Sequence, residues 1–248
     1  HTHLVWAGDR ADEFTQRLQG KTYLEILEDG GGILSTVKAT RNASITTLVR
    51  ETKPRADLAF AYGTTTAEVK TGYGLDFATE IKQLEAILAL DMETPLDLVP
   101  TFLAAHAVPP EFDGKANAYV EVICSQMLPT LRDWWRANAG EKPLPFVDVF
   151  CERGAFDIKQ SRRILETAKE LGFPLKIHAD EFENLGGASL AAELGAVSAD
   201  HLVKTSPEDI QALAESQTAA VSLPGTPFGL NAAHSTPARE ILEACGLL

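Results

Sequence analysis

The chain has 248 residues, of which 45% are hydrophobic and 23% are charged, and its formal net charge is −13. These proportions are ordinary for a folded globular protein. Acidic residues outnumber basic ones by 35 to 22, whereas a surface that binds nucleic acid needs clustered Lys and Arg. The apolar runs are shorter than the roughly 18 to 20 residues that a membrane helix needs. We therefore expect neither nucleic acid nor a membrane as a partner.

The three cysteines, Cys124, Cys151 and Cys245, lie far apart in the sequence and form no CxxC pair. This spacing favours thiols in a reducing compartment over a disulfide framework. None of them has the sequence context of a nucleophile or metal ligand. We therefore expect buried core thiols in a cytoplasmic protein.

Apolar segments rich in β-formers alternate with segments of helical period along the chain, as in a parallel sheet with crossover helices. The clearest helices are expected at residues 76–90, 158–171, 187–194 and 207–214. Gly172 and Pro174 end the second of these, and Ser206 and Pro207 begin the fourth. Strands are expected at seven segments, which are residues 1–5, 64–70, 96–105, 145–151, 175–178, 198–202 and 219–223.

Seven strands alternating with helices favour an eight-stranded (β/α) barrel of the TIM type, a fold of about 250 residues. The chain stops at Gly246-Leu247-Leu248, where an eighth strand is expected to begin. The alternative, a doubly wound sheet, needs a glycine-rich phosphate loop after its first strand. The run Gly30-Gly31-Gly32 follows helical residues and lacks that form. We predict one barrel domain over residues 1–248, incomplete at both ends and without its eighth strand.

Five of the six histidines fall on or just after expected strands, where barrel enzymes place their active sites. His1 and His3 are two residues apart on one strand, so their side chains point to the same side and can reach one ion. His178 and His201 end later strands, and His106 follows another. Together they favour a metal centre.

Each histidine also has a structural alternative. An HxH pair arises often by chance, and His106 could simply order the turn before Pro109 and Pro110. His234 lies among Asn and Ser residues, and we expect it to be solvated.

Acidic residues accompany these histidines. Glu181, three residues after His178, could hold or deprotonate a metal-bound water, or could be an ordinary acid at a helix start. Asp180 and Asp200 could orient the imidazoles from behind or act as caps.

Two further residues are candidates for substrate contact. Arg10 follows the first expected strand and could bind a carboxylate in bidentate fashion; the alternative is a salt bridge to Asp9 or Asp12. Tyr73 lies in a Gly-Tyr-Gly segment, which could approach a ligand closely or be an ordinary turn.

The HxH pair and the histidine that ends strand five resemble the amidohydrolase superfamily. Within it, longer segments resemble the imidazolonepropionase family, and the resemblance covers essentially the whole chain. The most specific of them are GYGLD, HADE and SADHL. The full set is HTHLVWAGDR (residues 1–10), GGGI (30–33), EVKTGYGLD (68–76), DVFCE (148–152), HADE (178–181) and SADHL (198–202).

The resemblance implies one divalent metal ion, Zn²⁺ or Fe, bound by His1, His3, His178 and an aspartate at the end of strand eight. No residue of this chain replaces that aspartate by motif. The family's β-sandwich domain, built from both termini, is also expected to be missing, so the chain looks like an internal fragment. Glu152 stands where several binuclear relatives carry a bridging lysine, which agrees with a single metal.

The resemblance also implies functional roles and a reaction. His201 and Glu181 would be the catalytic acid/base pair, and the substrate would contact Arg10, Tyr23, Tyr73 and His106. The implied reaction is hydrolysis of the cyclic amide C–N bond of 4-imidazolone-5-propanoate to N-formimidoyl-L-glutamate in histidine degradation. The expected partner is a small-molecule substrate, with a homodimer as an option for assembly.

Three alternatives stay open. One is another amidohydrolase, such as a cyclic amidase or nucleobase deaminase. The second is a non-catalytic metal-binding protein, and the third is an inactive remnant.

Overall fold

The computed structural model describes residues 1–248 except 22–24, 27–30 and 245. The described residues divide into two compact units. Unit one contains His1 and Ala105–Leu248, and unit two contains Thr2–Ala104. No helix in the described ranges combines the length and the apolar character that a bilayer crossing requires.

Unit two contains helices and a parallel strand pair. Its elements are α1 (Ala11–Leu18), α3 (Ile33–Asn42), α4 (Ile45–Ala61), β1 (Thr66–Lys70), α5 (Phe77–Asp91) and β2 (Asp97–Ala105). The last residue of β2, Ala105, is already assigned to unit one. β1 and β2 are paired from Thr66 opposite Asp97 to Lys70 opposite Thr101. α5 begins at the expected place because the Asp76 side chain accepts a hydrogen bond from the Thr79 N–H.

Residues 1–5 are not a strand, and the expectation for this segment was wrong. Lys70 N–H donates to the Thr2 carbonyl at 2.9 Å, but side chains bind the carbonyls that follow. Arg55 donates to the Leu4 and Trp6 carbonyls, and Gln83 donates to the Val5 carbonyl at 2.7 Å. The segment is therefore held by helix side chains instead of a β-ladder.

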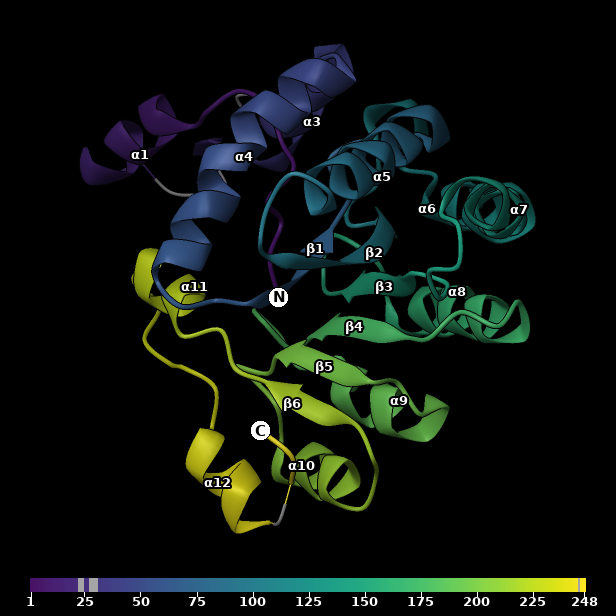
Figure 1. Ribbon diagram of the computed structural model, residues 1–248. Coiled ribbons are helices and arrows are strands. Elements are labelled where there is room, and N and C mark those ends of the chain that lie inside the picture. Colours follow the sequence, from purple (N-terminus) through teal and green to yellow (C-terminus); the bar gives the residue numbers. More distant parts are fainter. Residues whose placement is uncertain (22–24, 27–30, 245) are drawn as a thin grey trace. The chain divides into compact units, whose positions relative to one another are not determined.

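Unit one contains four parallel strands in chain order, β3-β4-β5-β6, drawn side by side in green to yellow (Figure 1). The strands are β3 (Phe146–Cys151), β4 (Lys176–Ala179), β5 (Ser198–His201) and β6 (Ala219–Val221). All four residues of β4 and all four of β5 are buried, as in parallel sheets covered on both faces. The chain order contains no reversal of the kind that defines a doubly wound sheet.

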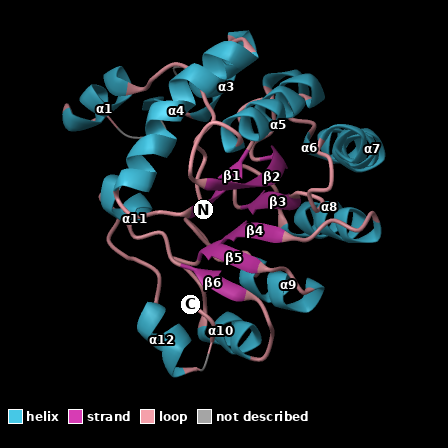
Figure 2. Cartoon of the chain, in the orientation of Figure 1, coloured by secondary structure: helices cyan, strands magenta, loops and turns pink. Residues whose placement is uncertain are grey.

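Helices connect the strands of unit one, and helix and strand alternate from β3 onward (Figure 2). α8 packs on β3, and α9 packs on β4 and β5. The helices are α6 (Ala116–Val122), α7 (Leu128–Asn138), α8 (Ile158–Glu170), α9 (Gly187–Leu194), α10 (Pro207–Ala214), α11 (Gly225–Gly229) and α12 (Ala238–Glu243), with a π-helical turn at Ile123–Met127 and a 3-10 turn at Pro110–Phe112. α9 and α10 have the bounds that the sequence predicted.

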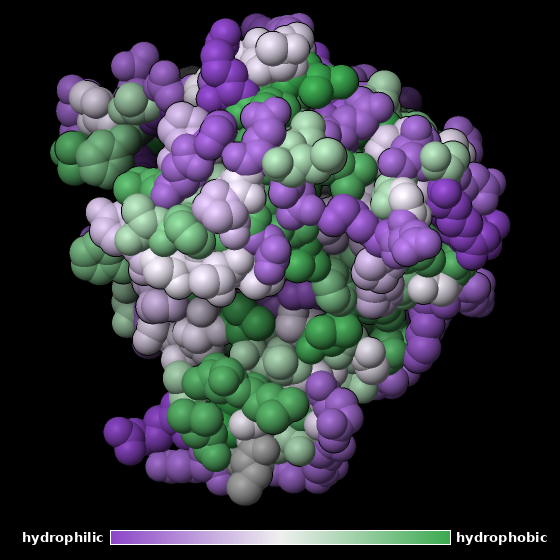
Figure 3. Space-filling model, viewed as in Figure 1, coloured by the Kyte–Doolittle hydropathy of each residue, from purple (hydrophilic) through white to green (hydrophobic). Residues whose placement is uncertain are grey.

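Apolar side chains also reach the surface near the C-terminal end of unit one. They form the green area over the last helices (Figure 3). Phe228, Leu242 and Leu247 are exposed at 87%, 57% and 54%. This part of unit one therefore presents apolar surface to solvent.

Candidate metal centre

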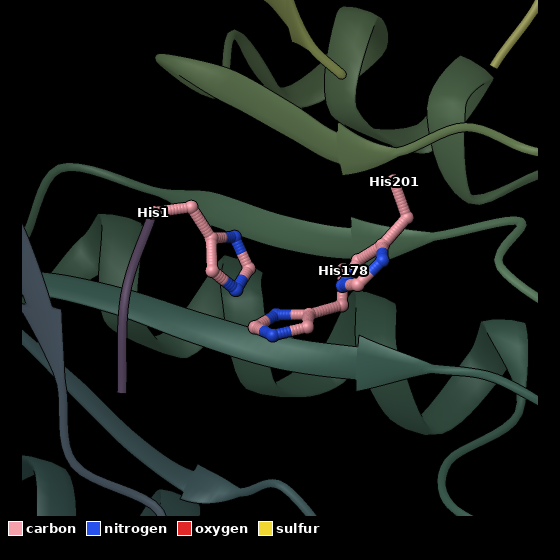
Figure 4. A group of neighbouring side chains, drawn as sticks. All are labelled: His1, His178 and His201. Atoms are coloured by element: carbon pink, nitrogen blue, oxygen red, sulfur yellow. The ribbon is translucent and has the colours of Figure 1, made fainter. Parts of the chain in front are cut away.

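Three histidines of unit one lie together at the carboxyl ends of its strands. His178 is in β4, His201 ends β5, and His1 is the first residue of the chain (Figure 4). In the β4–β5 register, Ala179 lies opposite His201. The ring centroids are 4.5 Å apart for His1 and His178, 5.1 Å for His178 and His201, and 5.3 Å for His1 and His201. One nitrogen from each ring lies within 4.8 Å of the others, so the group could hold a metal ion.

Two buried carboxylates orient two of these rings. The His1 Nδ1 lies 2.5 Å from Asp200 Oδ2, and Ser198 Oγ donates to the other oxygen of Asp200 at 2.6 Å. The His178 Nδ1 lies 2.9 Å from Asp148 Oδ2, and the His178 N–H donates to Asp148 Oδ1 at 3.1 Å. A carboxylate at Nδ1 fixes the ring and leaves Nε2 for an ion.

Asp180 and Asp200 were both expected to orient imidazoles, and Asp200 does so through its contact with His1. Asp180 accepts hydrogen bonds from the N–H groups of Leu185 and Gly187, both at 3.3 Å, and from Thr205 Oγ1 at 3.1 Å. Asp180 thus has the capping role that was left as the alternative. Asp148, which lies within β3, was not among the residues proposed for this role.

His201 and Glu181 form a second pair. The His201 Nδ1 lies 3.5 Å from Glu181 Oε1, and their side chains are 7% and 10% exposed. Burial raises the pKa of Glu181 to about 7, and the negative charge of Glu152 adds to the rise. A carboxyl with such a pKa can accept and release a proton near neutral pH.

The backbone around this pair adopts a conformation that is rare for residues other than glycine. The φ angles are +54° at Asp180, +79° at His201 and +58° at Leu202. Thr236 Oγ1 donates to the His201 carbonyl at 2.6 Å and helps to hold it there. Such strained backbone persists only where the surrounding structure holds it in place, and it is found most often at functional sites.

His106, which follows β2, lies beside this group in unit one. Its ring centroid is 5.7 Å from that of His178 and 6.1 Å from that of Phe150. The structure therefore brings together His1, His178, His201, Glu181 and His106 from the predicted set.

Two predicted residues, His3 and Tyr73, meet in unit two, with ring centroids 5.7 Å apart. The loop that carries Tyr73 is held from α5. The Glu80 carboxylate, fully buried, accepts from the N–H groups of Gly72, Gly74 and Leu75 at 2.7 to 2.9 Å. The Gly-Tyr-Gly segment is therefore a fixed loop, and Gly74 has no room for a Cβ, which would lie 2.8 Å from the Glu80 nitrogen.

Arg10 and Tyr23 complete the predicted set. The Arg10 Nε donates to Glu13 at 2.8 Å, so the salt-bridge alternative holds in this structure with Glu13 as the partner instead of Asp9 or Asp12. Tyr23 lies outside the described residues.

The remaining histidine and the described cysteines behave as expected. His234 is exposed, and Cys124 and Cys151 are free and buried. Burial raises the pKa of the Cys151 thiol to about 11, which makes it a poor nucleophile at neutral pH.

Curated relatives match along the whole chain. This chain is 54% identical over 249 residues to an imidazolonepropionase of Herpetosiphon aurantiacus, and the match covers 100% of this chain and 58% of the relative. It is 53% identical over 246 residues to an imidazolonepropionase of Chloroflexus aggregans, covering 98% and 58%. The resemblance inferred from the motifs is thus confirmed, and the share covered is consistent with an internal fragment. No family model matches the chain.

Solved structures show the same fold at low sequence identity. A 5-methylcytosine deaminase of Klebsiella pneumoniae, liganded with phosphonocytosine, matches with a TM-score of 0.63 at 14% identity, covering 93% of this chain and 54% of that one. An atrazine chlorohydrolase of Arthrobacter aurescens TC1, complexed with zinc, matches with a TM-score of 0.55 at 13% identity, covering 98% and 54%. The predicted α/β barrel fold is thus confirmed.

Proposed function

Given a similarity to imidazolonepropionases that extends along its whole length, we propose that this chain forms the barrel domain of such an enzyme. The enzyme would hydrolyse the cyclic amide C–N bond of 4-imidazolone-5-propanoate to N-formimidoyl-L-glutamate. The observation that carries the proposal is the 54% identity over the whole chain. The histidine group of unit one supports it because an amide hydrolase needs a way to activate water.

The donor set fits one divalent metal ion. Imidazole nitrogens suit Zn²⁺ and Fe, and the carboxylates behind His1 and His178 are the partners that metal-binding imidazoles usually have. His1 and His178 would hold the ion, with His3 as a third ligand by its place in the His-Thr-His motif. His201, the third ring of the histidine group in unit one, would carry protons beside Glu181 and would not be a ligand. The ion would supply Lewis-acid chemistry, polarising a carbonyl and making water more acidic.

Glu181 and His201 would move the protons. Water adds to the ring carbonyl carbon, the C–N bond breaks, and the proton lost by water reaches the leaving nitrogen. Glu181, with its pKa near 7, can take the first proton and return it, and His201 lies within 3.5 Å to share it. Removal of the proton and its delivery to nitrogen each lower the barrier to cleavage.

Substrate binding would fall to Arg10, Tyr23, Tyr73 and His106. Arg10 carries the charge that a propanoate group requires, and its side chain is 39% exposed. Substrate would compete with Glu13 for the guanidinium. Tyr73 stands on a loop that α5 holds in place, so it needs little ordering on binding.

We further propose a small-molecule substrate, assembly as a homodimer and a cytoplasmic location. The buried free thiols of Cys124 and Cys151 support a reducing compartment.

A nucleobase deaminase is the second candidate because the chain shares its fold with 5-methylcytosine deaminase. A substrate panel on the full-length enzyme separates the two. We expect turnover of imidazolonepropanoate, abolished by chelation and restored by Zn²⁺ or Fe²⁺. Ammonia release from cytosine or adenine, without turnover of imidazolonepropanoate, would instead support the deaminase.

A further inference from the structure

Glu152 is a buried acid directly after β3 that the mechanism above does not use. Glu152 is only 2% exposed. Oε2 accepts a hydrogen bond from the Phe182 N–H at 2.8 Å, and Oε1 accepts from the Arg153 N–H at 2.9 Å. The Glu183 N–H donates to both oxygens at 3.2 and 3.3 Å.

These contacts join the ends of two strands. Phe182 and Glu183 follow Glu181 in the loop after β4, 30 residues along the chain from Glu152. At the surface, Arg153 and Glu183 form an ion pair at 2.5 Å between the same two loops. The backbone beyond Glu181 is thus tied to the end of β3 by a carboxylate that water barely reaches.

We propose that Glu152 is a positioning residue for Glu181. Its carboxylate binds the two backbone N–H groups that follow Glu181 and so keeps the Glu181 carboxyl beside His201. This inference rests on the proton-transfer role proposed for Glu181.

The chemistry of the contact favours a carboxylate. Three N–H groups point at Glu152, and a carboxylate offers acceptors alone, whereas an amide would turn one NH₂ toward a donor. Hydrogen bonds to an ionised acceptor are about twice as strong as neutral ones. Glutamine at this position would therefore hold the loop less firmly.

Electrostatics point the same way. The negative charge of Glu152 raises the pKa of Glu181, second only to burial. Among the described residues, His201 from β5 also faces Glu181, at 3.5 Å. The neighbouring Asp180 carboxylate is bound to Thr205 and to the N–H groups of Leu185 and Gly187, and Arg153 is paired with Glu183. Removing the charge of Glu152 should let the pKa of Glu181 fall toward its ordinary value.

The test is Glu152→Gln in the full-length metal-loaded enzyme, with Glu183→Gln as a matched control. Both substitutions remove one negative charge from the same two loops. In Glu183→Gln, however, the changed side chain is 38% exposed, and the backbone N–H of residue 183 can still bind Glu152. For Glu152→Gln we expect kcat to fall roughly tenfold, since misplacement of a catalytic group is costly. The limb of the pH profile that Glu181→Gln abolishes should move to lower pH by roughly one unit. An unchanged kcat and profile in a folded variant would overturn the proposal.

A double-mutant cycle shows whether Glu152 acts through Glu181. In the Glu181→Gln background, Glu152→Gln should cost little further rate, because two changes that act through one group are not additive. Full additivity would make Glu152 an ordinary structural residue. If Glu152→Gln does not fold, Glu152→Asp keeps the charge but shortens the reach, and should lower kcat with little shift of the profile; an unchanged kcat would overturn the positioning role.

A titration of ¹³C-labelled glutamate carboxyls by NMR needs no substrate. The Glu181 resonance, assigned by its loss in Glu181→Gln, should titrate at lower pH in Glu152→Gln and unchanged in Glu183→Gln. A wild type inactive on imidazolonepropanoate refutes the proposed function, while an unmoved Glu181 titration refutes the electrostatic coupling to Glu152, so the two failures are distinguishable.

Discussion

Replacing Asp148 by Asn should weaken metal binding although Asp148 is not itself a proposed ligand. Its carboxylate is fully buried and holds the His178 ring through Nδ1 at 2.9 Å and the His178 N–H at 3.1 Å. Asparagine keeps the shape but loses the charge, and its NH₂ group can point at the imidazole. The ring would be less firmly held and Nε2 less basic.

The expected magnitude follows from the contact. Loss of such a carboxylate partner typically lowers metal affinity about 10-fold to 100-fold, which corresponds to about 1.4 to 2.7 kcal/mol. Competition with a chromophoric chelator gives the Kd for Zn²⁺ in the wild type and the variant. Asp133→Asn is the control because Asp133 lies on α7 and its side chain is 73% exposed. The Kd of this variant for Zn²⁺ should match that of the wild type.

A Kd for Zn²⁺ of Asp148→Asn within a factor of about two of the wild-type value would show that Asp148 does not support the metal site. Thermal unfolding of the metal-free proteins shows whether the variant is folded, so that a lost fold is not read as lost affinity.

Four more substitutions test other parts of the site. His178→Ala should remove both metal and activity, whereas His201→Ala should keep the metal and lower kcat by about 10² to 10⁴; equal metal loss by elemental analysis would contradict this division of roles. Arg10→Ala should lower kcat/KM by roughly 10-fold to 150-fold, because a charge-assisted pair contributes about 1.5 to 3 kcal/mol, and a substrate analogue without the carboxylate should show no such difference. Glu181→Gln should stabilise the metal-free protein at pH 8. The pKa of Glu181 is about 7 in the folded protein and 4.5 for an ordinary glutamate, so ionisation of Glu181 lowers the free energy of unfolding. This loss is absent below pH 4.5 and reaches up to about 3 kcal/mol above pH 7. Denaturant titrations at pH 4 and pH 8 check this, and an equal effect at both pH values would refute it.

The described strands could be predicted because they alternate with helices that have clear end signals. Predicted and observed bounds agree within about two residues for β1 to β6, the usual uncertainty of element ends. Residues 1–5 were predicted as a strand because the short segment His-Thr-His-Leu-Val contains β-formers and precedes the first helical stretch. The donors that bind its carbonyls come from Arg55 and Gln83, about 50 and 80 residues away, and no local pattern reveals them.

The candidate site was predictable to the extent that it follows strand ends. His178 and His201 meet because adjacent parallel strands end at the same edge, and His1 and His106 lie beside them in unit one. Asp148 was missed because an acid inside a buried strand shows its partner only after the register is known. The roles of individual residues, from the ligands to Arg10 and Tyr23, stay predictions.

The central claim is cleavage of a cyclic amide by water, and the most direct measurement follows the oxygen of that water. The full-length enzyme, incubated with imidazolonepropanoate in H₂¹⁸O, should give N-formimidoyl-glutamate with one heavy oxygen in its α-carboxylate, detected by mass spectrometry. No product in the metal-loaded enzyme, or release of ammonia with the ring intact, would contradict the account.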